Sequence, residues 1–178
     1  RLSAPCKEAP AQSVSIAFKL EARKTGKGKH AFQIVETDGK LCIFFPAEKE
    51  TTQLKFHVHA PFISTVARDS VPHSNEGNIS LRNQLVKLLV ASLPLLRDEG
   101  FLTTDFLGVL PNDPDALNKF YVPFIYRVVN VMKTQPLVPA RSGGHEAAQD
   151  LTKPAGRIHE VIADSDLEYL TDGEHRLW

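Results

Sequence analysis

The sequence predicts an α+β fold in which a mixed or antiparallel sheet of about four strands is backed by two long helices. Two observations lead to that prediction. Up to residue 59, apolar residues alternate with polar ones in short segments separated by turn-forming residues, which is typical of half-buried strands. Beyond residue 77, apolar residues recur at three- and four-residue spacing, which is typical of amphipathic helices.

The composition is that of an ordinary globular protein. The chain has 178 residues, of which 42% are hydrophobic and 24% charged. Lys and Arg number 21, as do Asp and Glu, so no overall field attracts nucleic acid or an anionic membrane. No apolar run approaches the roughly 20 residues that span a bilayer, and the first residues do not resemble a signal peptide. We therefore expect a cytoplasmic protein with no membrane partner.

Three regions follow from the distribution of Pro, Gly and apolar residues. Residues 1–12 contain two prolines and no periodicity, which predicts a linker. Residues 13–135 hold the α+β domain. The mixture of Pro, Gly and polar residues in residues 136–178 predicts an extended segment followed by short C-terminal helices, which would lead into a further domain. Because the chain begins with Arg and not Met, we expect a fragment of a longer protein.

Four strands are expected before residue 60. The first covers residues 14–20, where the apolar positions are Val14, Ile16, Phe18 and Leu20. An Asp-Gly pair between Phe32–Val35 and Leu41–Phe45 predicts a hairpin. The second of those arms is apolar on both faces, which predicts a central strand. The fourth strand covers Leu54–His59.

The first long helix is expected to begin near Asn78 or Ser80, either of which can cap it. Gly100 stands where a residue after the C-terminal cap belongs, and Pro94 predicts a bend. Its apolar stripe should pack on the sheet.

Further helices follow. Thr103 or Thr104 can cap a short helix, and a second long helix should begin near Asp113 or Asp115 and bend at Pro123. Its apolar side consists of Leu117, Phe120, Tyr121, Phe124, Val128 and Met132. Two short helical pieces are expected over residues 156–163 and 164–175.

The loop at the end of Leu54–Val71 is the strongest candidate for function. It places Arg68 among Ser and Thr residues between a strand and a helix, where a rigid scaffold commonly holds functional side chains. The alternative is that Arg68 only forms a surface ion pair with Asp69 or Asp105.

Two other segments suggest different functions. The basic loop 23–30, RKTGKGKH, has glycines and lysines that suit a phosphate and would serve a nucleic-acid or protein binding module. It lacks the spacing of a phosphate-binding loop and no helix follows it, so a solvated hairpin turn is the better explanation. His57, His59 and His145 suggest a metal-dependent hydrolase, but their spacing matches no zinc motif, so we expect no metal.

The segment Leu41–Val71, with the sequence LCIFFPAEKETTQLKFHVHAPFISTVARDSV, resembles the region that follows the nucleotide-binding domain in sacsin-like GHKL ATPases. In those proteins a phenylalanine-rich strand pair leads to an arginine-containing loop. The later PLVPARSGGHEAA and the acidic DLEYLT segment also look like bacterial proteins of this type. The resemblance extends from about Val14 onward.

The resemblance implies a middle or transducer-like domain, as in the ninety-kilodalton heat-shock chaperone. The fold of such a domain is like that of the second domain of ribosomal protein S5. Such domains include a left-handed βαβ crossover and supply a basic residue that contacts the terminal phosphate of ATP in the neighbouring domain. By its place before the long helix, Arg68 matches that residue, which would make it the catalytic and nucleotide-contacting side chain. Ser64, Thr65, Asp69 and Ser70 would shape its loop.

The motifs of the family's ATP-binding domain are missing from this sequence. It has no helix with a Glu/Asn pair, no D-x-G-x-G and no glycine-rich lid. The resemblance therefore implies no cofactor in this fragment and no catalysis by it alone, with ATP and Mg²⁺ held by the parent protein. The implied partners are an N-terminal ATP-binding domain in cis, a client protein and, in the parent, a second copy in a homodimer.

Overall fold

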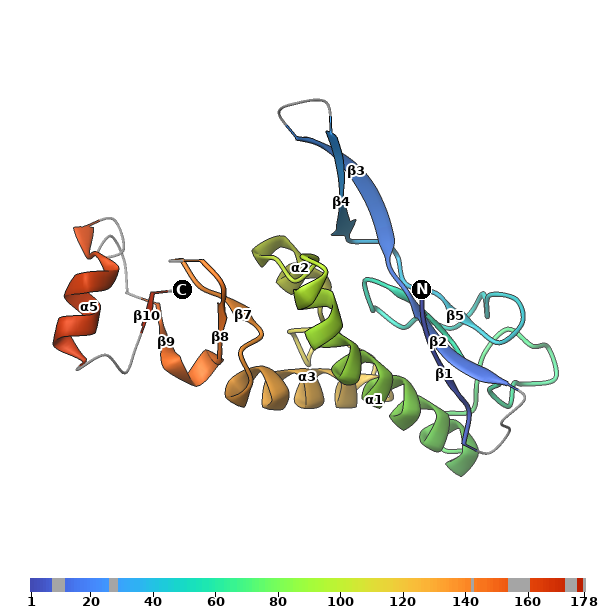
Figure 1. Ribbon diagram of the computed structural model, residues 1–178. Coiled ribbons are helices and arrows are strands. Elements are labelled where there is room, and N and C mark those ends of the chain that lie inside the picture. The colour runs from blue at the N-terminus through green and yellow to red at the C-terminus, as the bar shows by residue number, and fades with distance from the viewer. Residues whose placement is uncertain (8–11, 26–28, 142, 154–160, 172–175, 178) are drawn as a thin grey trace.

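The computed structural model describes residues 1–7, 12–25, 29–141, 143–153, 161–171 and 176–177 (Figure 1). Its central sheet has four strands in the order β1-β2-β6-β5. They are β1 (Leu2–Pro5), β2 (Ser13–Ala17), β6 (His57–His59) and β5 (Leu41–Cys42). The sheet is mixed, because β1 and β6 are antiparallel to β2 while β5 is parallel to β6. The predicted α+β class with a mixed four-strand sheet is thus confirmed.

Strand β1 corrects the prediction that residues 1–12 are a linker. It pairs antiparallel with β2, from Leu2 opposite Ile16 to Pro5 opposite Ser13. Cys6, the next residue, is buried, and its N–H donates to the carbonyl of Gln12 at 2.9 Å. The prolines misled the prediction because a proline is tolerated in an edge strand, where its missing N–H need not join the ladder.

The strand predicted over residues 14–20 is divided at Phe18. Val14 and Ile16 face the core as the alternation predicts. Strand β3 (Lys19–Thr25) then leaves the sheet and pairs antiparallel with β4 (Lys29–Val35). Figure 1 shows this hairpin projecting away from the central sheet.

The hairpin predicted around the Asp-Gly pair is wrong, because β4 pairs with β3 and β5 pairs with β6. Instead, this segment runs beside the approach to β6. The N–H of Thr37 donates to the Lys55 carbonyl at 3.3 Å, and that of Gly39 donates to the Leu54 carbonyl at 2.9 Å. A Cβ at residue 39 would lie 2.3 Å from the carbonyl oxygens of both Leu54 and Phe56. Glycine is therefore required by close backbone approach and not by a turn.

The central strand predicted over Leu41–Phe45 is also wrong. Only Leu41–Cys42 is a strand, and it lies at the edge of the sheet. The chain then reverses, so that the N–H of Ala47 donates to the Leu41 carbonyl at 2.9 Å. Phe44 and Phe45 lie on the reversal and are 79% and 83% exposed.

The fourth strand is shorter than the prediction over Leu54–His59, since only His57–His59 is a strand. Its predicted apolar side is nevertheless buried, with Leu54, Phe56 and Val58 at most 2% exposed. Residues 43–56, which join β5 to its parallel neighbour β6, contain no helix. This pair therefore does not form the βαβ crossover that the resemblance implies.

Helix α1 (Glu76–Asp98) begins earlier than predicted. Asn75 is its N-cap, and its side chain accepts from the N–H of Asn78 at 3.1 Å. The far end agrees with the prediction, because Gly100 follows the C-cap with φ 76°.

The buried residues of α1 pack against β1, β2 and α3. They are Asn78, Leu81, Leu85, Val86, Leu89, Ser92, Leu93 and Leu96. Within the described part of the chain, α1 is also long and apolar enough to cross a membrane by length and composition. Core helices pass the same test, and the packing of α1 on the sheet is that of a core helix.

Helix α2 (Thr104–Val109) has Thr103 as its N-cap, as predicted. Helix α3 (Val122–Thr134) begins several residues later than predicted. The N–H of Asp115 donates to the side chain of Asp113 at 2.9 Å, a local turn that competes with helix formation. Pro123 therefore lies in the first turn of α3, where its missing N–H costs nothing, and not at a bend.

The core lies between the sheet and these helices. The apolar side predicted for the second long helix is buried throughout: Leu117, Phe120, Tyr121, Phe124, Val128 and Met132. Phenylalanine rings connect the layers, with Phe18 and Phe56 at 5.3 Å between ring centroids and Phe56 and Phe124 at 6.1 Å.

The C-terminal region lies at the opposite end of the molecule from the central sheet (Figure 1). Its elements are β7 (Val138–Pro139), β8 (His145–Glu146), the 3-10 turn η1 (Ala148–Asp150), β9 (Leu151–Thr152), α5 (Asp164–Leu170) and β10 (Arg176–Leu177). The later of the two predicted helical pieces, over residues 164–175, is confirmed over Asp164–Leu170 as α5, and residues 172–175 lie outside the described residues. Most of the earlier one, over residues 156–163, lies outside the described residues.

Candidate functional site

Arg68 lies on a tight turn in the loop between β6 and α1. The N–H of Arg68 donates to the Thr65 carbonyl at 3.0 Å, and that of Thr65 donates to the Ser70 carbonyl, also at 3.0 Å. Arg68 itself has φ 58°, in the left-handed region that residues with a Cβ rarely adopt. Its side chain is exposed.

Asp69 holds this turn together. Its Oδ1 accepts from the hydroxyls of Thr65 at 3.1 Å and Ser70 at 3.2 Å. Its Oδ2 pairs with the ammonium of Lys49 at 2.7 Å, and its carbonyl accepts from the N–H of Lys49. The hydrogen bond from Lys49 is the main reason that the pKa of Asp69 lies below its ordinary value. The ion pair of Asp69 is thus with Lys49 and not with Arg68.

A buried amide fixes both ends of the loop. Asn78, in the first turn of α1, is fully buried. Its Oδ1 accepts from the N–H of Ile63 at 2.8 Å, while its Nδ2 donates to the carbonyls of Ile63 at 2.9 Å and Pro72 at 3.0 Å. One buried amide makes all three bonds, so the two ends of the loop are held in one position relative to α1.

Glu50 connects the end of the loop to α3. Its side chain is only 4% exposed and accepts from the Tyr121 hydroxyl at 2.8 Å and the Val71 N–H at 3.2 Å. Its Oε1 also lies 2.7 Å from Nε2 of His73. Burial, with the nearby Glu50 carboxylate, raises the pKa of Tyr121 far above its ordinary range. A buried carboxylate is costly unless it is hydrogen-bonded, and here both oxygens are.

The Arg68 loop and the reversal after β5 together enclose a cavity of about 580 Å³. It is lined by Ile43, Phe44, Phe45, Phe62, Ser64 and Arg68, and we call it the Arg68 cavity. The only charged side chain among these six is the guanidinium, and the only other polar one is the hydroxyl of Ser64. The lining can therefore bind an anion with an apolar body, but it contains no acid, base or thiol for covalent chemistry.

The structure does not bring the three suggested metal ligands together. His57 and His59 share one face of β6, where Nδ1 of His57 accepts from the N–H of Lys40 at 3.1 Å. His145 lies in β8, with Nε2 2.6 Å from the Leu102 carbonyl. Among the described residues, no group of three or more His, Cys, Asp or Glu side chains could hold a metal ion.

The described residues of the basic loop 23–30 form the last pairs of the β3–β4 hairpin, from Arg23 opposite Ala31 to Thr25 opposite Lys29. Arg23 is exposed there. Residues 26–28, which include both glycines, lie outside the described residues, so the nucleic-acid hypothesis stays a prediction.

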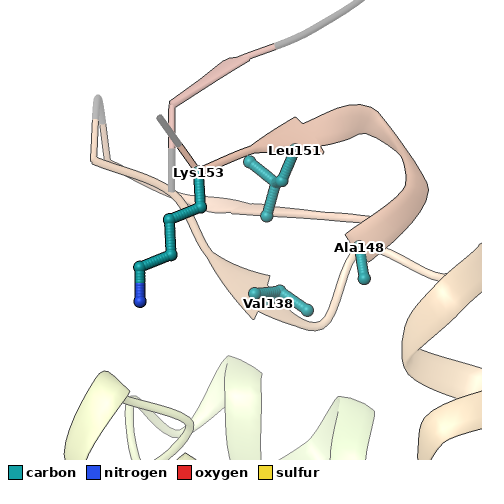
Figure 2. A pocket seen from close by; sticks show the side chains of 4 residues that line it. All are labelled: Val138, Ala148, Leu151 and Lys153. Carbon is teal, nitrogen blue, oxygen red and sulfur yellow. The ribbon is translucent and has the colours of Figure 1, made fainter. Parts of the chain in front are cut away.

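A second, smaller pocket of about 240 Å³ lies in the C-terminal region. It is lined by Val138, Ala148, Leu151 and Lys153, and Figure 2 shows the Leu151 side chain turned toward Val138 with Lys153 extending beside them. Its lining is mostly apolar and offers one ammonium group.

Comparison of the chain with protein-family models, curated proteins and solved structures found no match.

The sequence directed attention to Arg68 and to the residues of its own loop, but it missed the side chains that other segments bring to the site. Of the residues expected to shape the loop, Thr65, Asp69 and Ser70 bond to one another, whereas Ser64 lines the cavity. The rings of Phe44 and Phe45 were not anticipated there. The available signal in the sequence was the pair of adjacent phenylalanines just before Pro46. The prediction assigned both of them to a central strand, where they would be buried.

Proposed function

We propose that this chain is the transducer-like coupling region of a sacsin-like GHKL ATPase. In this proposal Arg68 contacts the terminal phosphate of an ATP molecule held by the N-terminal ATP-binding domain of the same protein. The observation that supports it best is an exposed guanidinium on a turn whose backbone is held from both sides.

The physical argument starts from the guanidinium. It is always charged and can make forked contacts with phosphate oxygens, so it distinguishes a triphosphate from a diphosphate. A loop that is already ordered loses little conformational freedom on contact. The bonds of Asp69 and Asn78 provide that order, since they fix the turn and the ends of the loop.

ATP and Mg²⁺ belong to the neighbouring domain in this proposal, and this chain supplies one positive group. The Arg68 cavity suits that role because its charge is positive and its mouth is at the surface. ATP supplies the phosphate whose presence is sensed, and the chain neither binds ATP tightly nor hydrolyses it alone. In this proposal the protein is located in the cytoplasm and acts on a client protein.

The test is ATP turnover by the protein that contains this chain together with its ATP-binding domain. Arg68→Ala is expected to lower turnover by about tenfold or more while nucleotide affinity changes little, because arginines that contact a transferring phosphate act mainly on the rate. Arg68→Lys should retain part of the rate, since an ammonium keeps the charge but not the fork.

The matched control is Arg127→Ala, which removes an exposed arginine from α3. Turnover should remain at the unmodified level in that variant. If Arg68→Ala and Arg127→Ala turn over ATP equally well, the proposal is wrong.

A further inference from the structure

We propose that the Arg68 cavity is a binding site for a small aromatic molecule that carries one anionic group, such as a carboxylate, a sulfonate or a phosphate. The site would work without ATP hydrolysis, so this inference goes beyond the coupling function and does not depend on it.

The size and lining of the cavity favour a small molecule. Its volume of about 580 Å³ lies within the range of about 300–1,000 Å³ that small-molecule sites occupy. Three phenylalanine rings and an isoleucine line it. Such sites are mostly apolar and contain a few polar groups that orient the ligand, which here are the guanidinium of Arg68 and the hydroxyl of Ser64.

The aromatic side of the cavity is held open by the backbone. The N–H of Ile43 donates to the Phe45 carbonyl at 3.1 Å, and that of Ala47 donates to the Leu41 carbonyl at 2.9 Å. These bonds reverse the chain so that Phe44 and Phe45 are directed outward and not into the core. Two adjacent phenylalanines that remain about four-fifths exposed provide flat apolar surface for an aromatic ring.

The charged side of the cavity is equally well defined. The carboxylate of Asp69, the next residue in the sequence, binds Lys49 and two hydroxyls. It therefore does not pair with the guanidinium of Arg68. The turn places Arg68 in the lining of the cavity despite the cost of its left-handed backbone. A guanidinium beside aromatic rings complements a ligand that is both aromatic and anionic.

The test uses two fluorescent dyes that differ in charge: anilinonaphthalene sulfonate, an aromatic anion, and phenylnaphthylamine, its neutral counterpart. The purified protein should bind one equivalent of the sulfonate dye saturably in the absence of nucleotide. Arg68→Ala should weaken binding of the sulfonate by about tenfold and leave binding of the neutral dye nearly unchanged, because only the anion loses a charge-assisted contact.

Phe45→Ala should weaken the binding of both dyes, because it removes apolar contact area that both use. Phe45 is exposed, so the fold does not depend on it, and Phe44→Ala serves as a second variant. The controls are Arg127→Ala and Phe32→Ala, which remove an exposed arginine from α3 and an exposed phenylalanine from β4. Both controls should bind the dyes as the unmodified protein does.

Three results would overturn the proposal. The first is the absence of saturable dye binding, which would mean that the cavity does not bind small aromatic anions. The second is equal loss of both dyes in Arg68→Ala, and the third is unchanged binding in both Phe44→Ala and Phe45→Ala. Dye binding and ATP turnover are separate measurements, so either proposal can fail while the other stands.

Discussion

At Gly39 the chain passes so close to a neighbouring segment that no side chain fits. A Cβ there would lie 2.3 Å from two carbonyl oxygens, which are backbone atoms and cannot rotate away. The hydrogen bond from the Gly39 N–H to the Leu54 carbonyl depends on this approach.

Gly39→Ala is therefore expected to lower the free energy of unfolding by roughly 2–4 kcal/mol, since overpacking forces the backbone apart. Urea unfolding measures this effect. Gly108→Ala is the control, because a Cβ there would lie 3.7 Å from its nearest neighbour, an ordinary contact. That change within α2 should raise stability by about 0.5–1 kcal/mol. Similar effects of the two substitutions would contradict the crowding at Gly39.

Arg68 illustrates the other residue-level feature, a strained backbone without glycine. A left-handed φ costs a residue with a Cβ on the order of 1 kcal/mol or more. Glycine would avoid that cost at Arg68, as it would at Gln53, which has the same φ of 58°. The sequence pattern alone carried no sign of the left-handed φ, because position 68 holds neither Gly nor Asn, the residues that most often adopt it.

At the scale of elements, the loop between β6 and α1 is held by groups from elsewhere in the chain. Lys49 and Glu50 reach it from the segment before β6, and Asn78 reaches it from α1. The loop is therefore a fixed part of the fold, and its stability should follow the charge state of its main hydrogen-bond acceptor, Asp69.

The lowered pKa of Asp69 makes this loop sensitive to acid. A carboxyl group whose pKa is lower in the folded protein stabilises the fold above its unfolded pKa, near 3.8, and that stabilisation is lost as the pH falls through the lowered folded value. We expect the stability difference between the unmodified protein and Asp69→Asn to be present at neutral pH and to vanish in strong acid. Thermal unfolding across this pH range measures it.

Lys49→Ala should reduce this pH-dependent difference, because the hydrogen bond from Lys49 is its main cause. A difference between the unmodified protein and Asp69→Asn that stays constant with pH would contradict the assignment.

The buried side of several elements could be predicted from the sequence, but the partner of each strand could not. The alternation in Leu54–His59 and the helical spacing from Leu117 to Met132 both identified core residues correctly. The hairpin prediction at the Asp-Gly pair is wrong because the pair's local turn preference gave way to pairing with a segment some 15 residues later in the chain. The predicted start of α3 is wrong because the side chain of Asp113 forms a competing local turn.

At the scale of the whole molecule, the site combines segments that are separate in sequence. The parallel pairing of β5 with β6 brings the reversal at Phe44 and Phe45 beside the loop of Arg68. Parallel pairing leaves no local signal comparable to a hairpin turn, so the sequence could indicate the arginine and not the cavity. The proposed coupling function requires this surface to face a second domain.

The most direct test of that claim is the reactivity of Arg68 toward an arginine-specific reagent such as phenylglyoxal, read by mass spectrometry. The protein should contain this chain and its ATP-binding domain, and it should be saturated either with a non-hydrolysable ATP analogue or with ADP. We predict that Arg68 is protected by the triphosphate and not by the diphosphate, whereas exposed Arg127 reacts equally in both states. Equal reactivity of Arg68 in the two states would contradict contact between Arg68 and the terminal phosphate.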